Sequence, residues 1–252
     1  MSECNNSMNL DRLVKTSRSE FKKGFTLAEV LITLGIIGVV AAMTIPNLIT
    51  GYQKTQAVQR LKKAYSVMQQ AIKLSEEDNG DVGSWDTTLK GKEFFHMYLF
   101  NYLKVMNEYS STELKKLAPR KNLNGTEYVG KVYNNANAYH FTLLDGSMIT
   151  THLNSAGEGG LWVGIDVNGL AKPNQLGRDT FLYFFSTEYG LRPLGDRGTP
   201  SNWSYGTYTR KKVGPKGSHA HSCTKSKQGY WCAALIMQDG WTMSSDYPFT
   251  GK

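Results

Sequence analysis

One apolar run near the start of the chain constrains the fold more than any other feature. Residues 25–49 (FTLAEVLITLGIIGVVAAMTIPNLI) contain a single charged side chain, Glu29. A helix of about 20 such residues spans the hydrocarbon core of a bilayer. The run is preceded by basic side chains, which predicts that the N-terminus stays in the cytoplasm and that the rest of the chain lies outside it. These basic residues are Arg12, Lys15, Arg18, Lys22 and Lys23.

A cleavable secretory signal peptide is the alternative interpretation of this run, because basic residues precede it and Val40-Ala41-Ala42 offers a small-residue cleavage site. Three features favour a membrane helix instead: the run is long, it continues past that site, and it carries a carboxylate near its start. The mean hydropathy of −0.40 for the whole chain excludes a protein with many membrane spans.

The residues around Glu29 form a specific motif. The stretch Lys22-Lys23-Gly24-Phe25-Thr26-Leu27-Ala28-Glu29, followed by an apolar helix with Gly35, Gly38 and Pro46, resembles the processing site and membrane helix of type IV pilins and type II secretion pseudopilins. The resemblance is dense from Lys22 to about Asn47. It implies that a prepilin peptidase cuts after Gly24 and that the new amine of Phe25 is methylated, with Lys23 holding the site at the membrane surface.

Four residues of the run have expected roles in assembly. A carboxylate in lipid is costly unless it is paired, and the resemblance implies that Glu29 pairs with the Phe25 amine of a neighbouring subunit. Gly38 and Ala42 form a small-x-x-x-small pair, which lets helices approach closely. Pro46 removes one backbone hydrogen bond and is expected to kink or loosen the helix.

The resemblance also implies partners and a location. The expected partners are other pilin or pseudopilin subunits, prepilin peptidase, the inner membrane and its assembly platform. The chain is expected in the bacterial inner membrane, with one span, a cytoplasmic N-terminus and an exported C-terminal domain, and then in a filament. We expect a minor pseudopilin of a type II secretion pseudopilus that drives protein export. The alternatives are a minor type IV pilus pilin for adhesion, motility or DNA uptake, and a membrane-anchored or secreted binding protein that never polymerises.

The pattern after the apolar run predicts an α+β fold, and the resemblance implies that this fold is pilin-like. Apolar residues at steps of three and four continue one helix from Phe25 to about Glu77, with Gly80 as its cap. A second helix is expected over Lys90–Met106 and a short helical turn over Glu113–Leu117. Four β-rich runs then predict an antiparallel sheet against which the long helix packs; they cover 139–144, 147–153, 161–167 and 180–186, with a hairpin turn at Asp145-Gly146.

These segments define the expected domain organisation. The boundaries are a leader at 1–24, a transmembrane helix at 25–49, its amphipathic continuation at 50–78, and an exported α+β globular domain at 79–252.

A polar loop between two predicted strands is a candidate calcium site. Asp166, Asn168 and the Leu170 carbonyl are spaced two apart around Gly169, and Asp179 supplies a later carboxylate. Oxygen ligands of this kind suit calcium, although the spacing departs from an EF-hand loop. The alternative is a Gly/Pro/Asn turn stabilised by its own side chains. Calcium is the one cofactor that the sequence suggests.

The cysteines suggest a disulfide in the exported domain. Cys4 lies in the leader, while Cys223 and Cys232 are close together in a compartment that favours oxidation. C-terminal disulfide loops are also common among pilins. The competing interpretation takes His219, His221 and Cys223 as metal ligands.

Catalytic motifs are absent from the sequence. It contains no nucleophile elbow, Walker loop, dinucleotide fingerprint or His-Glu-x-x-His, and His96, His140 and His152 are scattered without a sequence partner. We therefore expect a structural protein rather than an enzyme.

Positive charge is concentrated in one region. The chain has 29 Lys and Arg against 21 Asp and Glu, and residues 197–238 contain no acid. The basic side chains Arg210, Lys211, Lys212 and Lys216 lie there with Arg197, Lys225, Lys227 and the aromatic residues Trp203, Tyr205 and Tyr208. This mix suits DNA or an anionic surface. The alternative is a solvated loop around the disulfide.

Overall fold

The computed structural model describes residues 24–153, 160–196 and 209–249. The chain divides into two units, residues 1–47 and 48–252, and each is described by itself. Helix α1 (Leu27–Asn79) begins in the first unit and ends in the second, which confirms the predicted long N-terminal helix. Gly80 ends it as expected, because its φ is +80° and its N–H donates to the Glu76 carbonyl at 3.0 Å.

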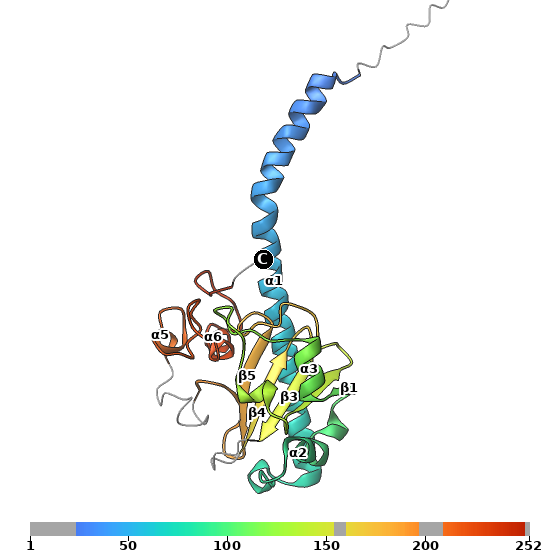
Figure 1. Ribbon diagram of the computed structural model, residues 1–252, viewed down its shortest axis with the longest axis vertical. Coiled ribbons are helices and arrows are strands. Elements are labelled where there is room, and N and C mark those ends of the chain that lie inside the picture. The colour runs from blue at the N-terminus through green and yellow to red at the C-terminus, as the bar shows by residue number, and fades with distance from the viewer. Residues whose placement is uncertain (1–23, 154–159, 197–208, 250–252) are drawn as a thin grey trace, which may run out of the picture. The chain divides into compact units, whose positions relative to one another are not determined.

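Six antiparallel strands follow in the second unit, and each pairs with the next along the chain (Figure 1). Their bounds are β1 (Val105–Tyr109), β2 (Tyr139–Leu143), β3 (Met148–Leu153), β4 (Leu161–Asp166), β5 (Thr180–Ser186) and β6 (Gly190–Pro193). Strands β2 to β5 are the four predicted runs. The predicted hairpin turn is also present, since Gly146 has a φ of +82° and Leu143 N–H donates to the Ser147 carbonyl at 2.8 Å.

The two edge strands were not predicted. The single helix expected over Lys90–Met106 is wrong beyond Tyr98, where the chain turns through a 3-10 segment and enters β1. Leu99 and Leu103 are buried as a helix would place them, but Met106 is exposed and Val105 pairs with Leu143 of β2, so pairing with a distant strand overrides the local pattern. The observed elements are η1 (Val82–Ser84), α2 (Gly91–Tyr98) and η2 (Phe100–Tyr102).

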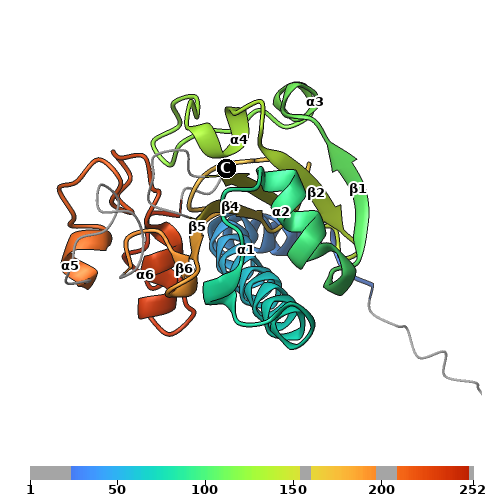
Figure 2. The same cartoon turned by 90° about the horizontal axis from the view of Figure 1, so that it is seen from below.

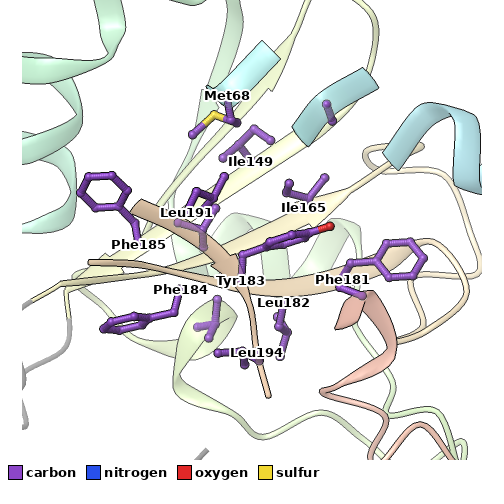
Figure 3. Close-up of a cluster of buried hydrophobic side chains, with 14 of the residues drawn as sticks. Met68, Ile149, Ile165, Phe181, Leu182, Tyr183, Phe184, Phe185, Leu191 and Leu194 are labelled. Atoms are coloured by element: carbon purple, nitrogen blue, oxygen red, sulfur yellow. The ribbon is translucent and has the colours of Figure 1, made fainter. Parts of the chain in front are cut away.

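The half of α1 that lies in the second unit covers one face of the sheet. Its buried side chains recur at helical spacing, namely Val58, Leu61, Ala64, Met68, Ala71, Ile72 and Ser75. Figure 3 shows Met68 above Ile149, Ile165 and Tyr183 of the sheet. The Tyr65 ring stacks on the Tyr183 ring with their centroids 5.6 Å apart. The predicted packing of the helical stripe on the sheet is therefore confirmed.

The other face of the sheet is covered as well, by α3 and α4 (Figure 2). Leu182, Phe184 and Leu194 lie on this side (Figure 3), so every residue of β5 is buried. Helix α6 packs beside β5, and α5 packs on α6. The bounds of these helices are α3 (Ser111–Leu117), α4 (Lys131–Asn134), α5 (Arg210–Val213) and α6 (Cys232–Gln238).

Candidate functional site

The expected processing site lies where the described chain begins. Lys23 is outside the described residues. Gly24 and Phe25 precede α1, and the Phe25 side chain is 88% exposed. A Cβ atom built on Gly24 would meet no other atom within 4 Å. Folding therefore does not require glycine at position 24, and any requirement for it arises from what acts on this segment.

Thr26 and Glu29 form a capping box at the start of α1. Glu29 Oε2 accepts hydrogen bonds from the backbone N–H and the hydroxyl of Thr26, both at 2.8 Å, and Glu29 N–H donates to Thr26 Oγ1 at 3.2 Å. These bonds satisfy donors that a helix start leaves without a partner. This capping role of Glu29 was not predicted, although the Thr-x-x-Glu spacing of Thr26 and Glu29 is typical of it.

In the part of the chain that the structure describes, nothing covers the apolar half of α1. Among the described residues one helix, α1, is long and apolar enough to cross a membrane, and none of its apolar window is buried. Gly38 and Ala42 are exposed, and a Cβ on Gly38 would meet nothing within 4 Å. The helix continues through Pro46. The exposed large apolar side chains are Leu27, Val30, Leu31, Ile32, Leu34, Ile36, Ile37, Val39, Val40, Met43, Ile45, Leu48 and Ile49.

The expected disulfide is present. Cys223 and Cys232 are bonded at 2.00 Å, and both are buried. Cys223 is therefore not available as a thiolate, which removes it as a metal ligand. The disulfide packs closely on Gly177, where an added Cβ would lie 2.6 Å from the Cys232 sulfur.

The histidines of the same region belong to an aromatic cluster. The His219 ring stacks on Trp231 with centroids 4.6 Å apart, and the His221 ring stacks on Tyr230 at 4.8 Å. Burial lowers the pKa of His221 to about 4, so its ring is neutral at physiological pH. Within the described residues, no three His, Cys, Asp or Glu side chains are grouped to hold a metal.

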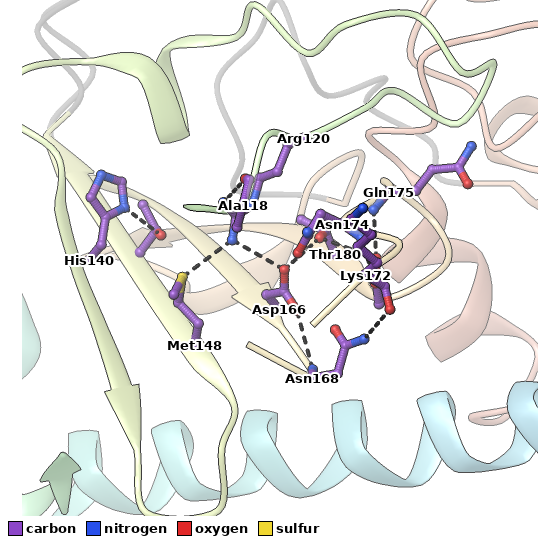
Figure 4. Close-up of polar contacts among 12 residues, drawn as sticks. Ala118, Arg120, His140, Met148, Asp166, Asn168, Lys172, Asn174, Gln175 and Thr180 are labelled. Atoms are coloured by element: carbon purple, nitrogen blue, oxygen red, sulfur yellow. Dashed lines mark hydrogen bonds and ion pairs between the residues drawn. The ribbon is translucent and has the colours of Figure 1, made fainter. Parts of the chain in front are cut away.

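Asp166, the first residue of the candidate calcium loop, lies in a buried polar network (Figure 4). Its Oδ2 contacts Arg120 Nη2 at 3.2 Å and accepts a hydrogen bond from the Thr180 hydroxyl at 3.0 Å. Its Oδ1 accepts a hydrogen bond from Asn168 N–H. Burial raises the pKa of Asp166 to about 7, and the Arg120 guanidinium opposes that rise. Arg120 is distant in the sequence, and no local signal marks it as the partner.

Asp179 closes the same loop. Its two oxygens accept hydrogen bonds from the backbone N–H groups of Asn174, at 2.8 Å, and Gln175, at 2.6 Å. The structure thus brings Asp166, Asn168 and Asp179 into one loop, in which both carboxylates accept hydrogen bonds from protein donors and Asn168 Nδ2 donates to the Lys172 carbonyl at 3.2 Å. This is the arrangement of a self-stabilised turn; calcium at Asp166, Asn168, Leu170 and Asp179 stays a prediction.

The basic region contains an internal charge network. Arg210 contacts Asp239 and Asp246, each at 2.6 Å. Both acids lie just beyond the acid-free region, which ends at residue 238. The sequence predicted that Arg210 contacts an anionic partner. This prediction needs correction, because two carboxylates already neutralise the Arg210 charge. Lys211, Lys212 and Lys216 are exposed. Arg197, Trp203, Tyr205 and Tyr208 lie outside the described residues.

Comparisons with known proteins give two matches. Residues 47–250 match the family of unknown function DUF6613. Residues 21–45 match the prokaryotic N-terminal methylation motif, which is typical of prepilins and pseudopilins. No curated protein and no solved structure matches the chain.

Proposed function

We propose a filament role for this chain, which belongs to the family of unknown function DUF6613 and begins with a prokaryotic N-terminal methylation motif. The chain is a pilin-like protein with a long N-terminal helix and an α+β domain. In our proposal it is a minor pseudopilin of a type II secretion pseudopilus. It waits in the inner membrane, is cut after Gly24 by prepilin peptidase, and is methylated at Phe25.

The observation that carries this proposal is the uncovered apolar half of α1. Its large side chains are exposed in the isolated chain, and an apolar surface of this extent calls for lipid or protein cover. Lipid supplies that cover before assembly, and the helices of neighbouring subunits supply it in a filament. In this scheme Glu29, which also caps the helix, compensates the Phe25 amine of a neighbour.

Gly38 supports packing between helices. Among the described residues, and apart from the adjoining backbone of the helix, nothing lies within 4 Å of a Cβ at this position, so a side chain there is tolerated by the fold. The small side of the helix at Gly38 and at Ala42, one turn further on, matters only where a second helix packs closely against it.

A matched pair of substitutions tests assembly. Gly38→Leu is expected to leave processing intact and to abolish incorporation into filaments, measured in the sheared or detergent-resistant filament fraction. Gly51→Leu is the control, because Gly51 lies on the same helix beyond the apolar run and also has open space at its Cβ. Normal incorporation of the Gly38 variant would contradict the proposed packing.

Deletion of the gene decides which filament system uses the subunit. Loss of protein export with surface pili intact supports the pseudopilus. Loss of surface pili, motility or DNA uptake with export intact supports the type IV pilus instead. Retention of both would favour a membrane-anchored binding protein that does not polymerise.

A further inference from the structure

A cleft of about 220 Å³ lies between α1 and the loop that follows β4. It belongs entirely to the second unit of the chain and lies apart from the processing segment. Gln53, Gln56 and Arg60 line it from α1, at positions that share one helical face. Asn168, Lys172 and Arg178 line it from the loop, and Figure 4 shows Asn168 on the side of the loop network that faces α1.

The charge of this cleft is positive. Arg60 and Lys172 are exposed, and Arg178 is half-buried. Asp179 is the one carboxylate among the lining residues, and its two oxygens already accept backbone hydrogen bonds from Asn174 and Gln175. Guanidinium and ammonium donors from two distant segments therefore line the cleft, while the amide nitrogens of Gln56 and Asn168 also donate to the Tyr52 hydroxyl and the Lys172 carbonyl. This donor set suits an anion with several acceptor oxygens, such as a phosphate group.

One wall of the cleft is apolar and aromatic. Two cations approach the Phe249 ring, with the Arg178 guanidinium 5.4 Å and the Lys54 ammonium 5.9 Å from its centroid. Ala57 and Pro173 extend this wall. A ligand with an anionic head and an apolar body would contact both parts of the cleft.

The cleft begins close to the predicted membrane surface. Gln53 follows Ile49, the last residue of the apolar run, by four positions, and even an extended chain of that length spans no more than about 14 Å. The polar headgroup layer of a bilayer is roughly 5–8 Å thick on each side. Long basic side chains near the end of a span extend into this layer.

We propose that this cleft binds the phosphate group of an anionic phospholipid in the outer leaflet of the inner membrane. The proposal rests on the membrane anchoring in the proposed function. Such a contact would hold the exported domain against the bilayer before assembly, and the subunit would lose it on leaving the membrane.

The test uses the full chain in nanodiscs that contain phosphatidylglycerol or phosphatidylcholine, with bound lipid counted by native mass spectrometry after release. Arg60→Gln/Lys172→Gln is the test variant, because both side chains are exposed. Lys115→Gln/Lys116→Gln is the control, since it removes the same charge from exposed positions on α3. Thermal unfolding checks that both variants fold. We expect wild type and control to retain phosphatidylglycerol preferentially, and the test variant to retain at least about tenfold less.

Several results would overturn the proposal. Equal retention of both lipids by the wild type would do so, as would equal losses in the test and control variants. Displacement of the lipid by millimolar inorganic phosphate would indicate a site for free phosphate, and loss of self-association in the test variant would assign the cleft to a second copy. Carbonate extraction of cell membranes separates the proposed membrane anchoring from the proposed lipid site. If carbonate extracts the chain, both proposals are refuted. If the chain stays in the membrane and the test variant binds as much lipid as the wild type, the lipid site alone is refuted.

Discussion

Arg120→Met removes the cation from a buried ion pair and is expected to destabilise the second unit of the chain strongly. The side chains of Arg120 and Asp166 are 3% and 0% exposed, with 3.2 Å between Nη2 and Oδ2. Removing one partner of a buried pair leaves an uncompensated charge and costs about 3–5 kcal/mol. Urea unfolding of the full chain in detergent, followed by tryptophan fluorescence, measures this loss.

The pH dependence of the stability lost in Arg120→Met identifies the cause of that loss. The pKa of Asp166 is raised to about 7 in the folded chain, above the value of about 3.9 for an unfolded chain. Its protonated form therefore favours folding at low pH, and that contribution is lost as pH rises through the folded pKa. Without Arg120 the folded pKa rises further. The variant should consequently lose more stability at pH 8 than at pH 5.

Two further variants complete the test. Arg120→Met/Asp166→Asn removes both charges and should recover about 2 kcal/mol of the loss through their coupling. Arg192→Met is the matched control, because its pair with Asp196 is partly exposed and is worth at most about 1 kcal/mol. Strictly additive losses in the double variant, or a pH-independent loss in Arg120→Met, would refute the reasoning.

Three other predictions concern separate parts of the chain. Replacing Cys223 and Cys232 by serine should cost about 2–5 kcal/mol, measured as in the experiment above; an unchanged unfolding midpoint would contradict this. Glu29→Gln keeps an acceptor for the helix cap but removes the charge, so this variant should be processed normally and fail to assemble. Thr26→Ala, which removes the other half of the cap, should still assemble. If filament fractions contain the Glu29 variant but not the Thr26 variant, Glu29 acts in capping alone. Arg210→Gln leaves two carboxylates with no cation and should lower the free energy of unfolding by about 1 kcal/mol or less. In a filter assay, the variant should bind DNA as the wild type does at every salt concentration. Weaker binding by the variant would show that Arg210 contacts DNA.

Local signals account for much of the fold. The apolar run and the helical stripe predicted α1, while four β-rich runs and the Asp145-Gly146 turn predicted four strands and one hairpin. Each of these signals depends on neighbours in the sequence. Strand β1 was missed because its pairing with β2 is non-local. Strand β6 was missed because Gly190–Pro193 is short and ends in proline, so it shows no usable alternation.

The same difference between local and non-local signals applies to the candidate site. The processing motif and the Cys223–Cys232 disulfide are readable because their residues are close in sequence. The partners of Asp166 and Arg210 are not, since each ion pair joins distant segments. A charge count along the chain therefore overstated the free positive charge at Arg210.

Mass spectrometry of the mature N-terminus tests the central claim most directly. The chain purified from membranes of its own host should begin at Phe25, with one methyl group on the amine. That result would show cleavage after Gly24 by a prepilin peptidase and modification for assembly. A mature chain that begins at Met43, or an intact leader in assembled material, would contradict the account.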